Sequence, residues 1–406
     1  MKILMLTPYL PYPDSSGGQI RTLNLLKHLC KTNEITLVSL IKDKKENDNI
    51  KYLLKYCKKV MTFPRSATPW TFKNILRTGF SLDPFLIVRN SAEGAKEAIA
   101  KELETGDYDL IHAETFYVMP SLPKTNIPTI LVDQTIEYLV YQHYVDETAP
   151  WFIRPLLQID VEKLKHSERY YWRKADQVVA VSEADRVEMN KLEPDLPVDI
   201  VPNGVNLDLF KKKTNWDSKE PTILFVSNFK WLQNIEAALV LIKEVYPLVK
   251  KSIPKVKLLI TGQFITDNIK EAALNKKGIT VTELPVDDVD SLVKAYHDSS
   301  VFASTIKGPG GTRLKNLAAM ASQLPIVSTK VGVEGLMVKD KAHVLIGNTP
   351  EKIAELIVSV IKSPKLAEKL ATATRKHVEE NFDWRKIAVN LDAIYQKLGQ
   401  NEKLQK

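Results

Sequence analysis

Short apolar runs alternate with amphipathic helical stretches along this chain, and the alternation occurs twice. In the first half, five such runs predict buried strands: Ile3–Leu6, Ile35–Ile41, Leu110–Ala113, Thr129–Val132 and Gln177–Val181. Helices are predicted between them, notably over residues 19–31 and 152–174. Because strands and helices take turns, we expect an α/β fold in which helices cover both faces of a parallel sheet.

The pattern stops near residue 200 and then restarts. The segment Val201-Pro-Asn-Gly-Val205 and the polar residues 211–220 separate the halves, and apolar runs resume at Thr222. In the second half, the predicted helices include residues 232–251 and 350–362. We therefore predict two doubly wound, Rossmann-like domains, residues 1–200 and 201–380, with residues 381–406 forming a helix that packs back on the first. Since ligands of such sheets bind at the carboxyl ends of strands, we expect the two domains to face an interdomain cleft.

Composition excludes several classes of protein. The chain has 406 residues, of which 44% are hydrophobic and 26% charged, as in ordinary globular proteins. Its two cysteines, Cys30 and Cys57, are too few for a disulfide framework or a four-thiolate metal site. The start does not resemble a signal peptide, and no apolar run reaches the ~18 residues of a membrane span. We expect a cytoplasmic protein.

The net charge of +8 is unevenly distributed. Residues 42–89 contain eleven basic and four acidic side chains. Such a segment is suited to an anionic membrane surface, which predicts peripheral association with the inner membrane, or to a phosphate-bearing acceptor. The alternative is a solvated helix with extended lysines. No nucleic-acid-binding module accompanies the charge, so we expect no nucleic-acid partner.

Two glycine-containing loops are placed between a strand and a helix. The first holds Gly17, Gly18 and Arg21, and the second holds Gly310, Gly311, Thr312, Arg313 and Lys315. Glycines let a ligand approach the backbone, and a helix start offers free N–H groups to an anion. The second loop, with its two cations, predicts a diphosphate site; a tight turn is the alternative for the first. Neither loop has the P-loop or the Gly-x-Gly-x-x-Gly pattern.

His112 and two Asp-x-Asp triplets are further candidates. His112 stands at the end of a predicted buried strand, where it would point into the cleft; the alternative is a core histidine with its hydrogen bonds satisfied. The triplets Asp107-Tyr-Asp109 and Asp288-Val-Asp290 precede a strand and open a helix, so we interpret them as capping residues rather than a metal site.

In this order, the motifs resemble those of the retaining GT-B glycosyltransferases of group one, in particular a branch that makes surface polysaccharides. The likeness extends over essentially the whole chain. It rests on the first glycine loop, Asp109-Leu-Ile-His112, residues 175–183, 201–210 and 223–234, and the block from Gly310 to Val333-Glu-Gly-Leu336.

The resemblance implies roles for individual residues. Gly17 and Gly18 would lie beside donor and acceptor, and His112 would contact the donor sugar as the catalytic candidate. Gly310, Gly311 and Thr312 would contact the nucleotide diphosphate. The family's usual Arg…Lys pair is not in place; Lys230 is the nearest basic residue, and Asn234 stands in the same region. The family's two glutamates are also missing, because Gly310 and Ala318 occupy their places.

The function implied is transfer of a hexose from a nucleotide sugar to a glycan or lipid-linked acceptor, with retention of anomeric configuration and without a metal or other cofactor. Two alternatives remain open. One is a catalytically silent GT-B subunit that binds a partner enzyme or a glycan, which the missing glutamates favour. The other is a GT-B epimerase that acts on the nucleotide sugar itself.

Overall fold

The computed structural model describes residues 1–286, 288–308 and 312–405. The chain forms two compact units. Unit 1 is Met1–Pro202 together with the residues from Arg385 onward, and unit 2 is Asn203–Trp384. The last helix, α16 (Trp384–Gln405), thus belongs to unit 1 almost entirely.

Unit 1 is built on a parallel sheet of seven strands in the order β3-β2-β1-β4-β5-β6-β7. Every pairing between neighbours is parallel. The strands are β1 (Lys2–Thr7), β2 (Glu34–Ile41), β3 (Lys59–Pro64), β4 (Leu110–Glu114), β5 (Thr129–Asp133), β6 (Gln177–Ala180) and β7 (Val198–Ile200).

Helices connect these strands in chain order. They are α1 (Gly17–Leu29), the 3-10 helix η1 (Lys44–Asn49), α2 (Ile50–Leu53), α3 (Phe72–Phe80), α4 (Phe85–Asn90), α5 (Ala95–Thr105), the 3-10 helix η2 (Phe116–Ser121), α6 (Glu137–Glu147), α7 (Arg154–Lys174) and α8 (Glu183–Leu192). α16 joins this unit through the side chain of Asp392, which accepts a hydrogen bond from Asn33 Nδ2 at 2.6 Å.

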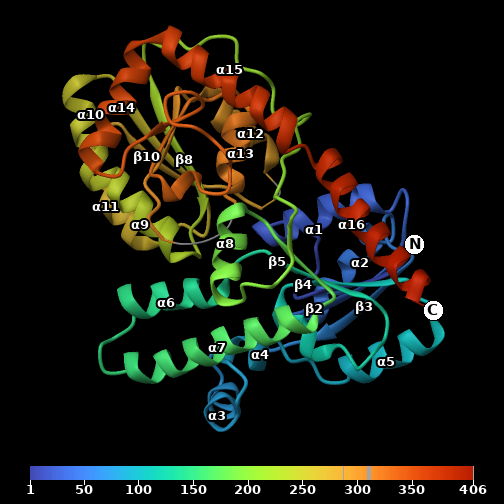
Figure 1. The fold of residues 1–406 in the computed structure, drawn as a ribbon. Coiled ribbons are helices and arrows are strands. Elements are labelled where there is room, and N and C mark those ends of the chain that lie inside the picture. The colour runs from blue at the N-terminus through green and yellow to red at the C-terminus, as the bar shows by residue number, and fades with distance from the viewer. Residues whose placement is uncertain (287, 309–311, 406) are drawn as a thin grey trace. The chain divides into compact units, whose positions relative to one another are not determined.

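Unit 2 has a parallel sheet of six strands in the order β10-β9-β8-β11-β12-β13. The strands are β8 (Thr222–Asn228), β9 (Lys257–Gln263), β10 (Ile279–Glu283), β11 (Val301–Ser304), β12 (Ile326–Ser328) and β13 (Leu345–Ile346). The helices are α9 (Leu232–Val240), the π-helix η3 (Leu241–Val245), α10 (Tyr246–Ser252), α11 (Asp267–Ala273), α12 (Val289–Asp298), α13 (Leu314–Ala321), the 3-10 helix η4 (Val331–Val333), α14 (Pro350–Lys362) and α15 (Pro364–Asn381). Within this unit, α9, α10, α11 and α14 lie on one face of the sheet, and α12, α13 and α15 on the other (Figure 1).

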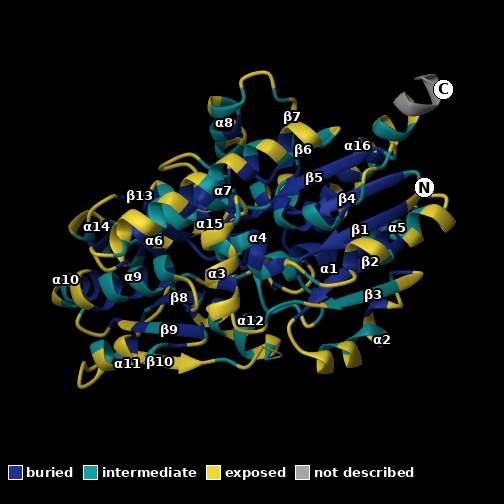
Figure 2. Cartoon of the chain, turned by 90° about the horizontal axis from the view of Figure 1, so that it is seen from below, coloured by how far each residue is buried: buried dark blue, intermediate teal, exposed yellow. Residues whose placement is uncertain are grey.

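The burial pattern of the central strands of unit 1 is typical of a parallel sheet. β1, β2, β4 and β5 are buried along nearly their whole length, as expected for strands covered by helices on both faces (Figure 2). Polar residues mark the helix starts: Ser16, Thr349 and Asp288 each accept a hydrogen bond from a backbone N–H in the first turn of α1, α14 and α12. The predicted fold class, two doubly wound parallel sheets, is confirmed.

The basic segment 42–89 contains η1, α2, the edge strand β3, α3 and most of α4, so it is not a single helix. Its strand β3 pairs with β2 from Thr36↔Lys59 onward. Lysines fit there because an edge strand leaves part of its surface in water. None of the helices in the described part of the chain combines the length and apolar composition needed to cross a bilayer.

Candidate functional site

An enclosed ammonium group lies at the carboxyl end of β8 in unit 2. Lys315 is in the first turn of α13, and its Nζ donates to Ser227 Oγ and to Asn234 Oδ1, both at 2.6 Å. Asn234 is held in turn by a hydrogen bond of 2.7 Å from its Nδ2 to the Asn228 carbonyl oxygen. The strand order of the sheet reverses between β8 and β11, which is where doubly wound sheets bind their ligands.

The charge of Lys315 is incompletely balanced. Its two hydrogen-bond partners are neutral oxygens, and no described carboxylate forms an ion pair with it. Burial lowers the pKa of Lys315 well below its usual value, and the positive charge of Arg313 lowers it further. A bound anion would compensate the charge of Lys315, so the arrangement suits a phosphate group.

The predicted phosphate loop is described only at its two ends. Arg313 Nη2 donates to the Gly308 carbonyl oxygen at 2.9 Å, and Thr312 is buried. Arg313 is the N-cap of α13 and makes no capping hydrogen bond with its side chain. Gly310 and Gly311, predicted to contact the diphosphate, lie outside the described residues.

Lys230, unlike Asn234, lies in an exposed position. Its Nζ lies 3.4 Å from the centroid of the Phe264 ring. Its backbone N–H donates to Asn228 Oδ1 at 3.1 Å. The structure therefore brings Asn234, Lys315 and the end of β8 together, whereas among the described residues the Lys230 side chain forms no hydrogen bond with Ser227, Asn234 or Lys315.

A second polar cluster lies at the carboxyl ends of β4 and β5 in unit 1. The Glu114 carboxylate has Oε1 3.1 Å from His112 Nε2 and 4.0 Å from Arg21 Nε, and its Oε2 accepts a hydrogen bond of 2.5 Å from Gln134 Nε2. Arg21 Nη1 also donates to the Pro202 carbonyl oxygen at 2.9 Å. His112, Glu114 and Arg21 are fully buried, so this network holds the carboxyl edge of the sheet together.

Both ring nitrogens of His112 face protein groups. Nε2 faces Glu114, and Nδ1 lies 2.5 Å from the hydroxyl oxygen of Tyr395 in α16. His112 is the third of five residues in β4, and the residue at the strand end is Glu114. In this state of the protein, His112 positions Glu114 and Tyr395, while the role at the donor sugar remains a prediction.

Glu114 is charged despite its burial. Burial raises the pKa of the Glu114 carboxyl, but the His112 ring 3.1 Å away, the charge of Arg21 and the hydrogen bond from Gln134 outweigh this effect, so the net shift is downward. Sequence analysis did not single out Glu114 or Gln134. Their position in the sequence could have identified them, because each residue stands at or just after the carboxyl end of a buried strand.

The two glycines of the first loop differ in their surroundings. A Cβ added to Gly18 would overlap the Tyr9 hydroxyl oxygen and lie 2.7 Å from Gln134 Oε1. Gly17 is the exposed first residue of α1. A side chain at position 18 would therefore require Tyr9 and Gln134 to move.

Ala318, in the place of one family glutamate, lies in the middle of α13 and is 8% exposed. It packs in the apolar core of unit 2. Its methyl group offers no hydrogen bond to a ribose.

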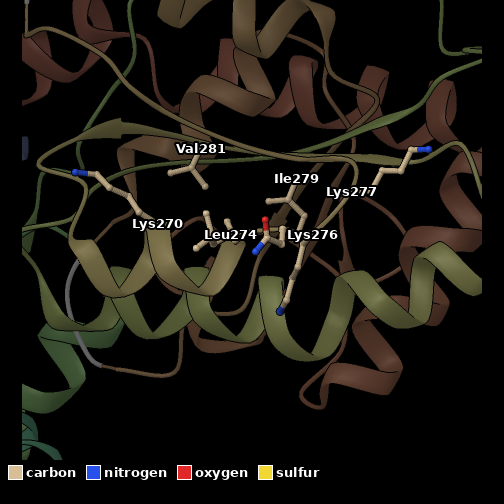
Figure 3. A pocket seen from close by; sticks show the side chains of 8 residues that line it. Lys270, Leu274, Lys276, Lys277, Ile279 and Val281 are labelled. Atoms are coloured by element: carbon tan, nitrogen blue, oxygen red, sulfur yellow. The ribbon is translucent and has the colours of Figure 1, made fainter.

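An open depression in unit 2 is separate from these clusters (Figure 3). Its lining comes from the end of α11, the loop after it and β10, and includes Lys270, Leu274, Lys276, Lys277, Ile279 and Val281. Because the loop precedes β10, the depression extends to the amino end of that strand, and no predicted site residue lines it.

Two family descriptions match the chain, one for each half. Residues 15–209 match "Glycosyltransferase Family 4", and residues 220–363 match "Glycosyl transferases group 1". An uncharacterized 44.6 kDa protein in the cps region of Klebsiella pneumoniae is 22% identical over 397 residues, which are 95% of this chain and 97% of that protein. The alpha-monoglucosyldiacylglycerol synthase of Streptococcus pneumoniae is 25% identical over 321 residues, covering 73% of this chain and 68% of the synthase.

Solved structures share the fold at low sequence identity. Sucrose-phosphate synthase from Thermosynechococcus elongatus has a TM-score of 0.71 and 17% identity, with 98% of this chain and 99% of that chain covered. HepE from Anabaena, in complex with UDP and glucose, has a TM-score of 0.64 and 14% identity, with 98% and 100% covered. These similarities show the GT-B arrangement of two Rossmann-like domains.

Proposed function

Because the chain belongs to the group 1 glycosyltransferases and has their GT-B fold, we propose that it transfers a hexose from a nucleotide sugar to a glycan or lipid-linked acceptor, with retention of the anomeric configuration. The acceptor would belong to surface polysaccharide or glycoconjugate synthesis. The protein in the cps region and the lipid-glucosylating synthase among its relatives support this choice of acceptor.

The observation that carries the donor part of the proposal is the unbalanced charge of Lys315 beside Arg313. When the sugar leaves, negative charge develops on the nucleotide diphosphate. Fixed cations and helix N–H groups stabilise such charge without rearranging. In this proposal Lys315, Arg313 and Thr312 do so at the start of α13, Asn234 orients the Lys315 ammonium, and no metal is needed.

On the unit 1 side, we propose that Glu114 and His112 act as a pair. The short contact of 3.1 Å fixes the orientation of both side chains, and Arg21 and Gln134 fix the carboxylate. His112 would thereby position groups around the donor sugar. No protein nucleophile is assigned.

Calorimetric titration with UDP, GDP and ADP tests the donor site. We expect one nucleoside diphosphate to bind the wild type, and Lys315→Met to weaken that binding by about tenfold or more, because a charge-assisted hydrogen bond is lost. Lys369→Met, at an exposed position of α15, is the matched control and should bind as the wild type does.

Transfer is tested next, with the matching nucleotide sugar and acceptor extracts. A glycosylated product whose anomeric proton signal matches that of the donor supports retention. Nucleotide-sugar interconversion without an acceptor would show an epimerase instead. No binding of any nucleotide would favour the silent subunit.

We also propose that unit 1 docks on an anionic membrane surface through α3. The apolar residues Phe72, Ile75, Leu76 and Phe80 share one face of this helix and are 77%, 50%, 42% and 90% exposed. The exposed cations Lys73 and Arg77 are on the same helix. An apolar face beside basic residues is typical of helices that lie in the headgroup region of anionic lipids.

Vesicle sedimentation tests this docking. Phosphatidylglycerol vesicles should retain the protein at low salt and release part of it at high salt, because ions screen charges beyond ~8 Å at physiological ionic strength. Phe80→Ser should reduce retention without changing nucleotide binding. Equal retention of Phe80→Ser and wild type, or none on anionic vesicles, would contradict the proposal.

A further inference from the structure

Two arginines of unit 1 have donor groups without acceptors. Arg65 directly follows β3, and Arg89 is in the last turn of α4. Nε and Nη1 of Arg65 and Nε of Arg89 are buried and donate to no described residue. Such donors are costly to bury unpaired, so the folded protein would gain from a ligand that accepts their hydrogen bonds.

The two guanidinium groups also repel each other. Burial lowers the pKa of both, and the positive charge of Arg89 lowers the pKa of Arg65 further. Nearby acidic groups raise these pKa values in part: Glu46 acts on Arg65, Glu137 acts on Arg89, and the Tyr117 hydroxyl acts on both. None of these forms an ion pair or a hydrogen bond with either arginine in the described structure.

Their position in the fold is that of a ligand site. Arg65 follows the carboxyl end of β3, Tyr117 comes soon after β4, and Glu137 opens α6 after β5. These strands belong to one parallel sheet, whose carboxyl edge is where doubly wound folds bind ligands. Arg65 thus lies at the same edge of the sheet as Glu114, and the helix α4, which contains Arg89, contacts η2 just after β4.

We propose that Arg65 and Arg89 together bind a phosphate or diphosphate group of the acceptor substrate. A guanidinium group presents a planar fork of N–H donors that matches phosphate oxygens, and two neighbouring guanidinium groups match a phosphate ester better than a sugar hydroxyl. That the bound phosphate belongs to an acceptor rests on the proposed function, whereas the anion site itself does not. The site itself is tested by binding alone.

The segment between the two arginines favours a phosphate carried by a lipid. Residues 66–88 contain α3 with its exposed apolar face, and the Trp70 ring stacks on Phe85 with centroids 4.4 Å apart. A phosphate held by Arg65 and Arg89 would place an attached hydrocarbon chain near this apolar segment. A soluble phosphorylated acceptor shares the same head-group chemistry, so the experiment compares both.

Titration with inorganic diphosphate and with farnesyl diphosphate is the test. The wild type should bind both, and Arg89→Gln or Arg65→Gln should weaken binding of both by about tenfold or more. Tighter binding of the farnesyl ester supports a lipid phosphate as the source, and equal binding supports a soluble acceptor. Arg186→Gln, an exposed arginine of α8 paired only at i,i+3, is the matched control and should bind as the wild type does.

Two comparisons separate this site from the donor site and from a structural role. Arg89→Gln should leave UDP binding unchanged, whereas Lys315→Met should weaken UDP and spare farnesyl diphosphate. Without ligand, Arg89→Gln should unfold at the same or a higher temperature, because a repulsion is removed. Unchanged diphosphate binding in both arginine variants, no binding by the wild type, or equal losses for UDP and farnesyl diphosphate would overturn the proposal.

Discussion

At the scale of the residue, Gly18 separates a packing requirement from a ligand requirement. The Tyr9 hydroxyl and the Gln134 amide occupy the space that a side chain would need. Gly18→Ala should therefore lower the free energy of unfolding by about 1–3 kcal/mol in urea titrations without ligand. Gly17→Ala, at the exposed start of the same helix, should be neutral or gain up to ~1 kcal/mol. Unchanged stability of Gly18→Ala with a loss of nucleotide binding would instead support the ligand role.

Three carboxyl groups near the start of α6 predict a pH dependence. Burial raises the pKa of Asp133 and of Glu137 to about 7, and also raises that of Glu168. Repulsion by neighbouring acids raises these pKa values further, from Asp185 and Glu114 for Asp133 and from Asp133 for Glu137 and Glu168. The folded protein thus keeps protons that the unfolded chain has released above pH ~4, so the stability these groups contribute falls as pH rises from ~4 to 7.

Thermal unfolding between pH 5 and 8 measures this effect. The wild-type midpoint should decrease across the range, and Glu137→Gln should show a smaller decrease because one titrating group is gone. Identical pH profiles for the two proteins would contradict the assignment.

At the scale of the element, caps and burial decide what could be predicted. The helix predicted over residues 350–362 is observed as α14 with those bounds. Thr349 and Pro350 mark its start in the sequence, and Ser363 marks its end. The strand β3 was not predicted, because Thr62 interrupts its apolar residues and leaves no continuous apolar run. The stretch 232–251 was predicted as one helix, but a π-helix separates α9 from α10.

The site residues could be predicted only where the sequence pattern itself indicated the end of a strand. His112 and Lys315 stand near predicted strand–helix junctions. The contacts that define their surroundings join residues far apart in the chain, such as Lys315 with Asn234 or His112 with Tyr395. Arg65 and Arg89 contributed to the counted charge of segment 42–89, but only the folded sheet brings them near each other.

One prediction concerns the helix α13, where Ala318 occupies the place of a family glutamate. Ala318→Glu adds an acceptor for ribose hydroxyls about one turn beyond Lys315, and we expect donor affinity to rise several-fold, or ~1 kcal/mol. Without ligand the variant should melt at a lower temperature, because the new carboxylate stands at a position that is 8% exposed and lacks a partner.

Calorimetry and thermal unfolding check both parts, with Ala318→Gln as the uncharged control. The control should gain less affinity and lose less stability. Unchanged affinity of the glutamate variant for every nucleotide sugar would show that this part of unit 2 serves another purpose.

At the scale of the whole molecule, the two units share one feature, a pair of neighbouring cations near the carboxyl edge of the sheet. In unit 2 they are Lys315, whose hydrogen-bond acceptors are neutral, and Arg313. In unit 1 they are Arg65 and Arg89, which have buried donor atoms without acceptors among the described residues. A glycosyltransferase that takes both a nucleotide diphosphate and a phosphate-bearing acceptor needs two such anion sites. The proposals for the two units are therefore consistent, but they are tested by different ligands.

The return of α16 to unit 1 gives the last prediction. Ile387, Leu391 and Tyr395 of this helix are almost completely buried, and Tyr395 contacts His112 in β4. Removing the residues after Trp384 would uncover these apolar contacts and leave His112 without its partner. Burial of one large apolar side chain is worth roughly 1.5–3 kcal/mol, so the loss should be several kcal/mol and confined to unit 1.

Hydrogen exchange shows where the loss falls. Peptides from β1 and β4 should exchange faster in the truncated chain, whereas peptides from β8 and β11 in unit 2 should keep their protection. Tyr395→Phe is the matched control: it keeps the apolar contacts and removes only the hydroxyl, so its effect should be near 1 kcal/mol. Equal loss of protection in both units would show that they unfold as one cooperative structure, because a local loss in unit 1 leaves the sheet of unit 2 intact.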